Sequence, residues 1–267
     1  MTRAQDLPQL DARSLVDGER LEMEVKEMYR HVAREEEAEL HFELGRALAE
    51  QLGYDRELLD AIPAEALASF AGVGHHLDLA RLEPGESVLD LGSGSGTDVF
   101  CAAVLVGEAG RVAGVDITDE QLAKATLLRD RDGFGQVELL EAHIEELPFD
   151  DASFDAVISN GVINLSPVKG SVFAEAARVL RPGGRLAIAD IVSGQALKER
   201  TRRNVELWAA CIAGAIPRSS YLQAIEAEGL EIREVRRNDY RFISARALDA
   251  CSTYEVESIS LVAAKPD

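Results

Sequence analysis

The chain is poor in cysteine and has no long apolar run. Its three cysteines, Cys101, Cys211 and Cys251, are odd in number, widely spaced and without a CxxC pair. This usage argues against a disulfide framework and against a cysteine-based zinc site. No stretch approaches the roughly 20 apolar residues of a membrane-spanning helix, and the N-terminus is too polar for a signal peptide. We therefore expect a cytoplasmic protein with no membrane partner.

Positive charge is also scarce. The 267 residues include 28 basic side chains, only five of them lysine, against 48 acidic ones, which gives a formal net charge of −20 with histidine neutral. Affinity for nucleic acid comes largely from Lys and Arg that neutralise phosphates. The charge balance therefore disfavours a nucleic-acid partner and leaves a small molecule as the expected one. The simplest reading of the acidic excess is a solvated surface.

The composition changes near residue 83. Before it, residues 20–59 are charged and carry apolar side chains at spacings near three to five, which is typical of amphipathic helices. After it, strand, loop and helix alternate, which indicates a mainly parallel sheet with helices on both faces. We predict an N-terminal helical cap over residues 1–82 and a cofactor-binding domain over residues 83–267.

The expected fold class is α/β, a doubly wound, Rossmann-like mixed sheet of seven strands with the N-terminal helical cap. The last two strands have no expected helix between them, and so they are predicted to be antiparallel. The predicted strands cover residues 87–91, 111–115, 137–140, 156–159, 185–190, 231–236 and 255–263. The predicted helices cover residues 97–106, 119–131, 168–180, 198–213 and 219–228.

The most informative segment is a strand that runs directly into three glycines, Gly92, Gly94 and Gly96, with a helix after them. Such glycines permit a tight turn and let a ligand lie against bare backbone at the carboxyl end of the strand. The spacing differs from the G-x-G-x-x-G of a dinucleotide site, where a helix N-terminus holds a pyrophosphate. Asp90, two residues before the first glycine, would repel a pyrophosphate but suits a ligand with an ammonium and a sulfonium. The pattern favours S-adenosylmethionine over NAD.

A second acid has the required position. Asp116 ends the second predicted strand, 24 residues beyond Gly92, and can accept hydrogen bonds from both ribose hydroxyls. A ribose contact fits either cofactor, so the glycine spacing decides between them. Two plainer alternatives stay open: a glycine-rich turn that binds nothing, and an aspartate that caps the next helix.

At these residues the sequence resembles the class I S-adenosylmethionine-dependent methyltransferases. Residues 90–96 resemble the family's motif I, Asp116 resembles its ribose-binding acid, residues 144–149 match the segment that places the adenine, and residues 178–184 resemble the turn before the fifth strand. The cofactor-binding residues that we expect on this basis are Asp90, Gly92, Ser93, Gly94, Gly96, Asp116, Ile117, Gln121, Ile144, Glu145 and Asn160.

Within that superfamily, residues 115–122, 158–166 and 208–215 are most similar to the arsenite methyltransferases. That family captures trivalent arsenic with cysteines, one of which follows the asparagine of the Ser-Asn segment, where this chain has Gly161. Another family cysteine lies in the N-terminal half, but no cysteine precedes Cys101 in this chain. Of the three cysteines here, only Cys211 falls on a position that matches a family cysteine. Trivalent arsenic is soft and prefers thiolates. Arsenite is therefore a hypothesis to test beside other acceptors.

Methyl transfer from a sulfonium is an in-line displacement that mainly needs alignment of the reactants. A general base is needed only if the acceptor must lose a proton. We take Asn160, at the end of the fourth strand, and Cys211 as catalytic candidates. Tyr29 is the third, because it resembles a tyrosine that closes over the methionine end of the cofactor in related enzymes. An aromatic side chain packed on the domain is the alternative for Tyr29.

The histidines His31, His75, His76 and His143 are possible bases. His75 and His76 are adjacent rather than four residues apart, so they do not form a helical metal site, and helix capping or surface placement is favoured. We expect no metal site. Trp208 is a candidate wall for the acceptor or a core residue, and Cys101, in an apolar helix, is expected to be a buried structural thiol.

Several functions are consistent with these residues. The leading one is a small-molecule methyltransferase of the arsenite-methyltransferase type. A C- or O-methyltransferase of a quinone or natural product, with the N-terminal helices as its lid, is the first alternative. A protein that binds S-adenosylmethionine without catalysis is the second. An NAD-dependent oxidoreductase is the third.

Overall fold

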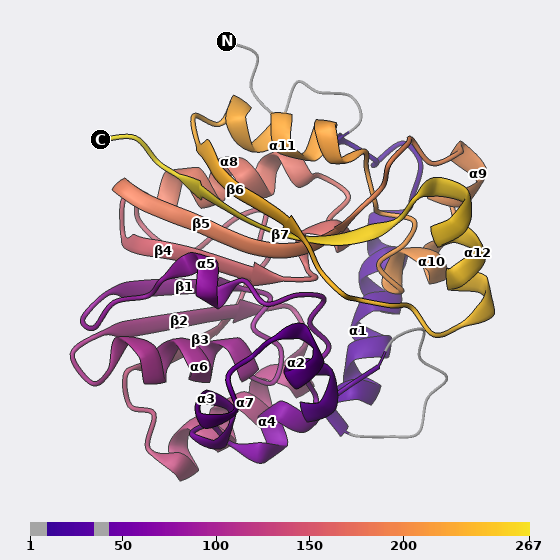
Figure 1. The fold of residues 1–267 in the computed structure, drawn as a ribbon. Coiled ribbons are helices and arrows are strands. Elements are labelled where there is room, and N and C mark those ends of the chain that lie inside the picture. Colours follow the sequence, from indigo (N-terminus) through magenta and orange to yellow (C-terminus); the bar gives the residue numbers. More distant parts are fainter. Residues whose placement is uncertain (1–9, 35–42) are drawn as a thin grey trace.

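A seven-stranded sheet forms the centre of the molecule (Figure 1). The computed structural model describes residues 10–34 and 43–267. The strand order is β3-β2-β1-β4-β5-β7-β6, and β7 alone runs antiparallel to its neighbours β5 and β6. The strands are β1 (Ser87–Leu91), β2 (Arg111–Asp116), β3 (Val137–Glu141), β4 (Phe154–Asn160), β5 (Leu180–Val192), β6 (Glu231–Arg237) and β7 (Glu257–Ala264). The predicted Rossmann-like mixed sheet is confirmed.

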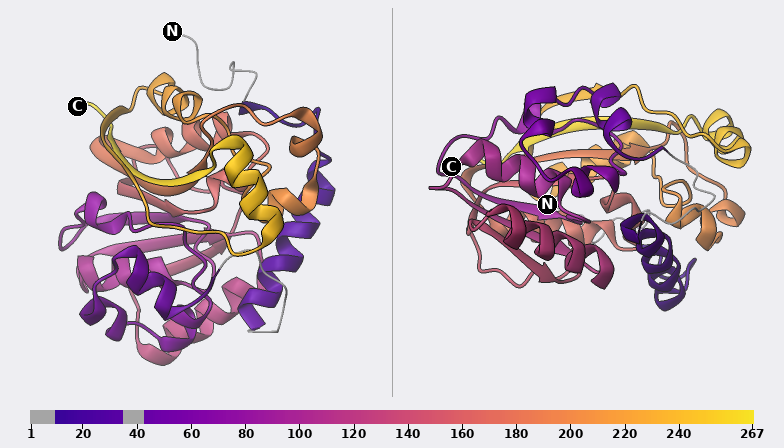
Figure 2. Two further views of the ribbon diagram at one scale, coloured as in Figure 1. Left: turned by 45° about the vertical axis from the view of Figure 1, so that its right-hand side comes forward. Right: turned by 90° about the horizontal axis from the view of Figure 1, so that it is seen from below.

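Helices cover both faces of this sheet (Figure 2). Those before β1 are α1 (Gly18–Arg34), α2 (Arg46–Leu52), α3 (Arg56–Asp60), α4 (Ala64–Ala68) and α5 (Leu77–Ala80). Those between the strands are α6 (Thr97–Val106), α7 (Asp119–Asp132), α8 (Lys169–Val179), α9 (Glu199–Arg202), α10 (Val205–Ala209), α11 (Arg218–Ala227) and α12 (Ala245–Tyr254).

Side chains that alternate along the strands separate two layers of core. In β1, Val88 packs with α5 and α6 on one face, whereas Leu89 packs with α8 and α11 on the other. Such alternation follows from the period of two along a strand. Because both faces are covered, the central strands are buried throughout, as parallel sheets in α/β proteins are. A third cluster, around Trp208, joins α1, α10 and α12 beyond the sheet.

Two sequence-based predictions in the C-terminal part are wrong. Residues 198–213 do not form one helix but two short ones, α9 and α10. The side chain of Asn204 caps α10 by accepting a hydrogen bond from the Leu207 amide, and Cys211 beyond it is left-handed, with a φ of 60°. A helix also lies between the last two strands: α12, which the Ser244 side chain caps. Side-chain caps on short segments begin α10 and α12, whereas α9 has none, and short segments of this kind carry too weak an apolar period to be found from the sequence. The antiparallel pairing of β6 and β7 is confirmed.

The N-terminal helices divide into two groups. Residues 20–59 were expected to be helical, and the described part contains α1, α2 and α3; residues 35–42 lie outside it. The short helix α5 packs against β4, β5 and β7, and so it belongs to a sheet layer although it precedes residue 83. In contrast, α1 stands at one end of the sheet and packs on α7 and α10 (Figures 1 and 2). The division of the chain at residue 83 stays a prediction.

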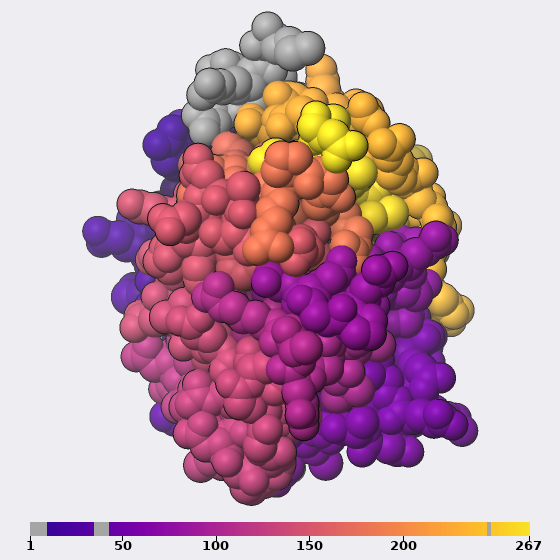
Figure 3. All heavy atoms as spheres, turned by 90° about the vertical axis from the view of Figure 1, so that its left-hand side faces the viewer, coloured from indigo at the N-terminus to yellow at the C-terminus, as the bar shows by residue number. Residues whose placement is uncertain are grey.

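The side of the molecule opposite α1 is drawn in Figure 3. There the C-terminal residues, in yellow, lie beside the orange segments of α11 and β6. Within the ranges that the structure describes, no helix is long and apolar enough to cross a membrane.

Candidate active site

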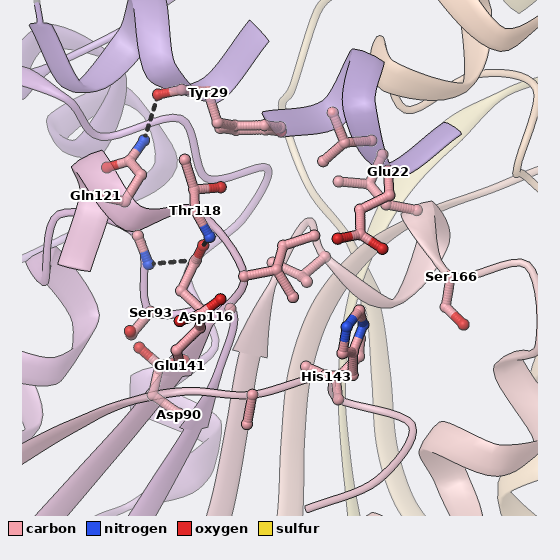
Figure 4. A pocket seen from close by; sticks show the side chains of 18 of the residues that line it. Glu22, Tyr29, Asp90, Ser93, Asp116, Thr118, Gln121, Glu141, His143 and Ser166 are labelled. Atoms are coloured by element: carbon pink, nitrogen blue, oxygen red, sulfur yellow. Dashed lines mark hydrogen bonds between the residues drawn. The ribbon is translucent and has the colours of Figure 1, made fainter. Parts of the chain in front are cut away.

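A cavity of about 920 Å³ lies at the carboxyl ends of the central strands, beneath α1. Three groups of residues form most of its wall: the loop after β1, the segments that follow β2, β3 and β4, and the inner face of α1 (Figure 4). Open α/β sheets bind ligands at this edge, where the strand order reverses. The volume falls within the roughly 300–1,000 Å³ of ligand pockets, at its upper end.

The glycine loop has the backbone that the sequence predicted. Gly92, Gly94 and Gly96 have φ values of 76°, 53° and 97°, a region that side chains disfavour. A Cβ at Gly92 would overlap the Val162 side chain, and one at Gly96 would lie 2.6 Å from the Phe100 ring. Gly92 and Gly94 line the cavity, whereas Gly96 lies behind them as the N-cap of α6.

Asp116 is bonded to the glycine loop and to its own turn. One carboxylate oxygen accepts from the Gly94 amide at 2.9 Å, and the other accepts from the Thr118 amide at 2.8 Å (Figure 4). Burial raises the pKa of Asp116, and these backbone hydrogen bonds act against the rise. The carboxylate therefore fixes the loop that it faces, and each oxygen keeps a second lone pair for a ligand in the cavity.

Asp90 and Ser93 are buried polar groups that face the same cavity (Figure 4). Burial raises the pKa of Asp90 well above its ordinary value, and the neighbouring carboxylates Asp98 and Asp116 raise it further. Ser93 Oγ is buried and has no hydrogen-bond partner among the described residues. An unpaired hydroxyl and mutually repelling carboxylates are costly without a partner. A ligand with a cationic centre and hydrogen-bonding groups, as S-adenosylmethionine has, fits this set.

The apolar part of the cavity lies beside these groups. Ile117, after β2, and the buried Ile144, after β3, both line it, as does Glu145. His143 lies on the same segment and faces Glu22 of α1 (Figure 4). Two aliphatic side chains with acidic groups at their edge suit a planar base with amino hydrogens.

Gln121 lines the cavity, but its amide is occupied by protein groups. Its Oε1 accepts from the Ser95 hydroxyl, and its Nε2 donates to the Tyr29 backbone carbonyl at 2.9 Å. The predicted contact of Gln121 with a cofactor thus competes with two internal hydrogen bonds. The geometry makes Gln121 a link between the glycine loop and α1.

Asn160 also lines the cavity with its polar atoms already bonded. Its Oδ1 accepts from the Val73 amide at 2.8 Å, and its Nδ2 lies 3.0 Å from Tyr54 Oη and 3.1 Å from Asp98 Oδ2. Tyr54 Oη donates to the other Asp98 oxygen at 2.6 Å. This buried network fixes the end of β4 against the segment around Val73, and the catalytic role of Asn160 stays a prediction.

Tyr29, on the inner face of α1, lies next to Cys211. Tyr29 lines the cavity, and its phenol oxygen lies 4.0 Å from Cys211 Sγ. Cys211 lies behind the wall; its thiol donates to the Gly161 carbonyl at 3.5 Å, and burial raises its pKa to about 12. Gly161 is left-handed, with a φ of 75°, and a Cβ there would lie 3.2 Å from Val73 Cγ1. The positions of Gly161 and Cys211 are therefore neighbours, but together they provide only one thiol, and that thiol is protonated.

The remaining candidates do not reach the cavity. His76 is the N-cap residue of α5, as one of the expected roles required, but its buried ring nitrogens are unpaired, so its side chain makes no cap. His75 packs on Tyr54 with ring centroids 4.3 Å apart, so the expected surface placement of the pair is wrong. Trp208 is a core residue, 1% exposed. His31, on α1, is not part of the cavity wall. Cys101 is buried, as expected.

Metal ligands do not gather in the site. Across residues 10–34 and 43–267, no group of three or more His, Cys, Asp or Glu side chains has the arrangement of a metal site.

Sequence reasoning missed part of the wall. Asp98 lies two residues beyond Gly96, in the first turn of α6, and this position after the glycine loop was a usable signal. Glu22 and Val25 of α1 share a face with Tyr29 at helical spacing, which also pointed to them. Leu165 and Ser166, after β4, lie in the segment 158–166 that resembles the arsenite methyltransferases, but they were not named as site residues, and Pro167 and Val168 carry no pattern that could have identified them.

Comparison with known proteins agrees with this geometry. The methyltransferase-domain family matches residues 82–241. An arsenite methyltransferase of Halobacterium salinarum is 37% identical over 220 residues, 82% of this chain and 56% of that protein. One of Aquipseudomonas alcaligenes is 43% identical over 168 residues, 60% of this chain and 48% of that protein. The chain thus spans about half the length of these curated relatives.

A solved structure is similar over most of the chain. It is that of CrArsM, an arsenic(III) S-adenosylmethionine methyltransferase from Chlamydomonas reinhardtii, with 33% identity and a TM-score of 0.63. The likeness covers 84% of this chain and 75% of the other. The chain therefore belongs to the class I S-adenosylmethionine-dependent methyltransferase family.

Proposed function

We propose that this protein transfers a methyl group from S-adenosylmethionine to a small molecule. The observation that carries the proposal is the glycine loop fixed by Asp116 on one side of a cavity that also holds the unpaired Ser93 hydroxyl. The cavity has room for a cofactor and an acceptor together. When bound, S-adenosylmethionine would supply a methyl group on a cationic sulfur, and the sulfur is the leaving group when a nucleophile attacks the methyl carbon in line.

In this proposal the residues of the chain bind the cofactor and orient it. Asp116 would accept hydrogen bonds from the ribose hydroxyls of the cofactor, and Asp90 would offer a negative charge to its cationic end. Ile117 and Ile144 would form the apolar contact with the adenine, and Glu145 would accept from its amino group. Together these contacts fix the reacting carbon, which is the part of catalysis that alignment supplies.

The wall formed by α1 excludes water from the reacting end. Val25 and Tyr29 lie over the cavity, and Tyr29 is held both by its backbone bond to Gln121 and by its contact with Cys211. Exclusion of water strengthens the electrostatic contacts inside the site. No proton transfer by these residues is required unless the acceptor must lose a proton.

The charge of the wall favours a neutral or cationic acceptor. Apart from His143, the ionisable Asp, Glu, His, Lys and Arg side chains that the structure places around the cavity are all acidic. They are Glu19, Glu22, Asp90, Asp98, Asp116, Glu141, Glu145 and Glu146. An anionic acceptor would meet this field without a basic partner, and its approach is disfavoured. The same field supports the prediction that nucleic acid is not a substrate.

Two acceptor classes follow from different observations. Similarity to arsenite methyltransferases favours an arsenical. The single protonated thiol of Cys211 and the left-handed Gly161 beside it favour an organic acceptor, because a soft trivalent arsenic atom needs several thiolates. A quinol or a natural product would use the apolar wall instead. The cytoplasmic location stays a prediction.

Methylation assays with labelled cofactor separate these readings. Purified protein is incubated with arsenite and glutathione, or with a neutral quinol such as menadiol, and the labelled product is identified by mass spectrometry. A methylarsenical supports the arsenical reading. A methylated quinol with no methylarsenical would remove it. Binding of the cofactor without turnover on either acceptor would favour the non-catalytic alternative, and thermal stabilisation by NADH alone would favour an oxidoreductase.

A further inference from the structure

Gln121 joins two walls of the cavity that are far apart in the sequence. It is 2% exposed and lies in the first turn of α7. Its Nε2 donates to the Tyr29 carbonyl in α1 (Figure 4). Its Oε1 accepts from the Ser95 hydroxyl in the glycine loop. A carbonyl only accepts and an amide nitrogen only donates, so the orientation of the amide is fixed by its partners.

Neighbouring residues of α7 hold α1 at other points. Glu120 Oε1 accepts from Arg30 Nε at 2.6 Å, and Lys124 Nζ donates to the Ala33 carbonyl at 3.1 Å. These contacts fasten the C-terminal half of α1 to α7. Gln121 differs from Glu120 and Lys124 because it also bonds to the Ser95 hydroxyl, which belongs to the loop that the cofactor would contact.

A displacement of α1 would alter the cavity wall and also the surroundings of Trp208, whose fluorescence can be measured. The inner face of α1 supplies Glu22, Val25 and Tyr29 to the cavity wall. The same helix packs on α10, which carries Trp208, the only tryptophan of the chain. The emission of this single residue therefore reports whether α1 is docked.

We propose that Gln121 is a positioning residue that couples occupancy of the glycine loop to the docking of α1. The inference rests on the proposed function, since it takes S-adenosylmethionine as the ligand of the loop. A ligand that holds the loop in one conformation fixes the Ser95 hydroxyl, and this orients the Gln121 amide toward the Tyr29 carbonyl. By linkage, docking of α1 raises the affinity of the loop for its ligand by the same factor.

The test compares two adjacent substitutions in the full chain. Gln121→Met keeps the length of the side chain and removes both hydrogen bonds. Glu120→Gln is the matched control, because it removes the ion pairs with Arg30 and Arg34 while Gln121 keeps both partners. The probe is S-adenosylhomocysteine, and three readouts are taken: its affinity by calorimetry, hydrogen exchange of the α1 amides, and Trp208 fluorescence.

In the wild-type chain the probe is expected to slow exchange in α1 by about tenfold and to shift the Trp208 emission. Gln121→Met should reduce the ligand-dependent slowing to less than about twofold and weaken the affinity about fivefold. Glu120→Gln should raise exchange with and without the probe by a similar factor, so that the ligand-dependent ratio remains.

Two negative results are distinguishable. If the probe binds Gln121→Met and still slows exchange in α1 as in the wild type, Gln121 does not couple the two parts and the inference is overturned. If the wild-type chain does not bind the probe at all, the proposed function fails and the inference fails with it.

Discussion

The Cys211 thiol donates a hydrogen bond to the Gly161 carbonyl at 3.5 Å, and so the one cysteine at a position expected from the family resemblance directly contacts the glycine that stands where that resemblance expects a second cysteine. Gly161 brings no sulfur, and burial raises the pKa of Cys211 to about 12. Near neutral pH the thiol is therefore protonated and satisfied by a backbone acceptor. A thiolate ligand for a soft atom would require both a second sulfur and the loss of this bond.

Thiol alkylation tests that description. In native protein at pH 8, iodoacetamide should modify Cys251 slowly, because this thiol is partly exposed but burial raises its pKa to about 11. Cys101 and Cys211 should stay unmodified, since both are buried. In urea all three should react. Peptide mass spectrometry measures the modification of each site. Rapid labelling of Cys211 in the native chain would contradict the protonated, buried thiol and would strengthen the arsenical reading.

Gly161→Ala is expected to destabilise the fold by about 1–2 kcal/mol, because φ is 75° and the added Cβ would lie 3.2 Å from Val73 Cγ1. Gly133→Ala is a matched control, since that glycine has a φ of 80° with nothing within 4 Å of an added Cβ. Urea denaturation gives both unfolding free energies. The contact with Val73 predicts the larger loss at Gly161; equal losses would show that backbone strain alone matters there.

Asp116→Ala should weaken binding of S-adenosylhomocysteine by about 2–3 kcal/mol, because two ribose hydrogen bonds to a carboxylate are lost. The variant also loses the hydrogen bond that the Gly94 amide donates to Asp116 Oδ2 in the wild type. Asp130→Ala, an exposed change on α7, serves as the control. Calorimetry measures the affinities, and an unchanged value for Asp116→Ala would exclude this residue from the cofactor site.

Asp90→Asn should have opposite effects on stability and on binding. Burial, Asp98 and Asp116 raise the pKa of Asp90, so its ionised form opposes folding at pH 8. Removing that charge should stabilise the ligand-free chain by about 1 kcal/mol and weaken the binding of the cationic cofactor. Thermal unfolding and calorimetry measure the two effects; a loss of both stability and affinity would mean that Asp90 has a structural role.

The pH dependence of this binding has a defined sign. A cation binds the ionised form of Asp90, so affinity for S-adenosylmethionine in the wild type should fall as the pH decreases through the raised pKa of Asp90. In Asp90→Asn this part of the pH dependence should disappear. A calorimetric pH series on both proteins checks the difference.

The sheet and the cofactor edge were predictable because local chemistry specifies them. The apolar strands and the glycines after Leu91 require particular backbone regions, and Gly92, Gly94 and Gly96 do lie in the left-handed half of the φ range. Asp116 was identified by its position at the end of the second strand, its offset from the loop and its resemblance to the family's ribose-binding acid. These signals come from residues close together in the sequence, so pattern reasoning finds them.

The contacts between distant segments could not be predicted in this way. Gln121 and Asn160 were assigned to ligands by resemblance, whereas their amides bond to Tyr29 and Val73, which only the tertiary fold brings near. The short helix α12 was missed because its stability depends on a Ser244 cap and on packing rather than on a long apolar period. A sequence pattern does not show which residues far apart in the chain contact each other in the fold.

Lys169 has such a hidden role and gives the last prediction. It is 2% exposed, donates to the carbonyls of Asn164 and Ser166 at 2.8 Å each, and lies 4.9 Å from the centre of the Trp208 ring. These contacts hold the wall segment after β4 against α10. Lys169→Met should destabilise the chain by about 2–3 kcal/mol at pH 7, because two buried carbonyls lose their donor.

The pH dependence identifies the cause. Burial lowers the pKa of Lys169 to about 7 from 10.5, with the nearby Asp190 acting against the shift. Between these two values the unfolded chain binds more protons than the folded one, so the Lys169 contribution to stability rises with pH over this window. The gap in unfolding free energy between the wild type and Lys169→Met should widen from pH 7 to pH 9.5 in urea denaturation. A gap independent of pH would mean that Lys169 stays protonated when folded and acts through its hydrogen bonds alone.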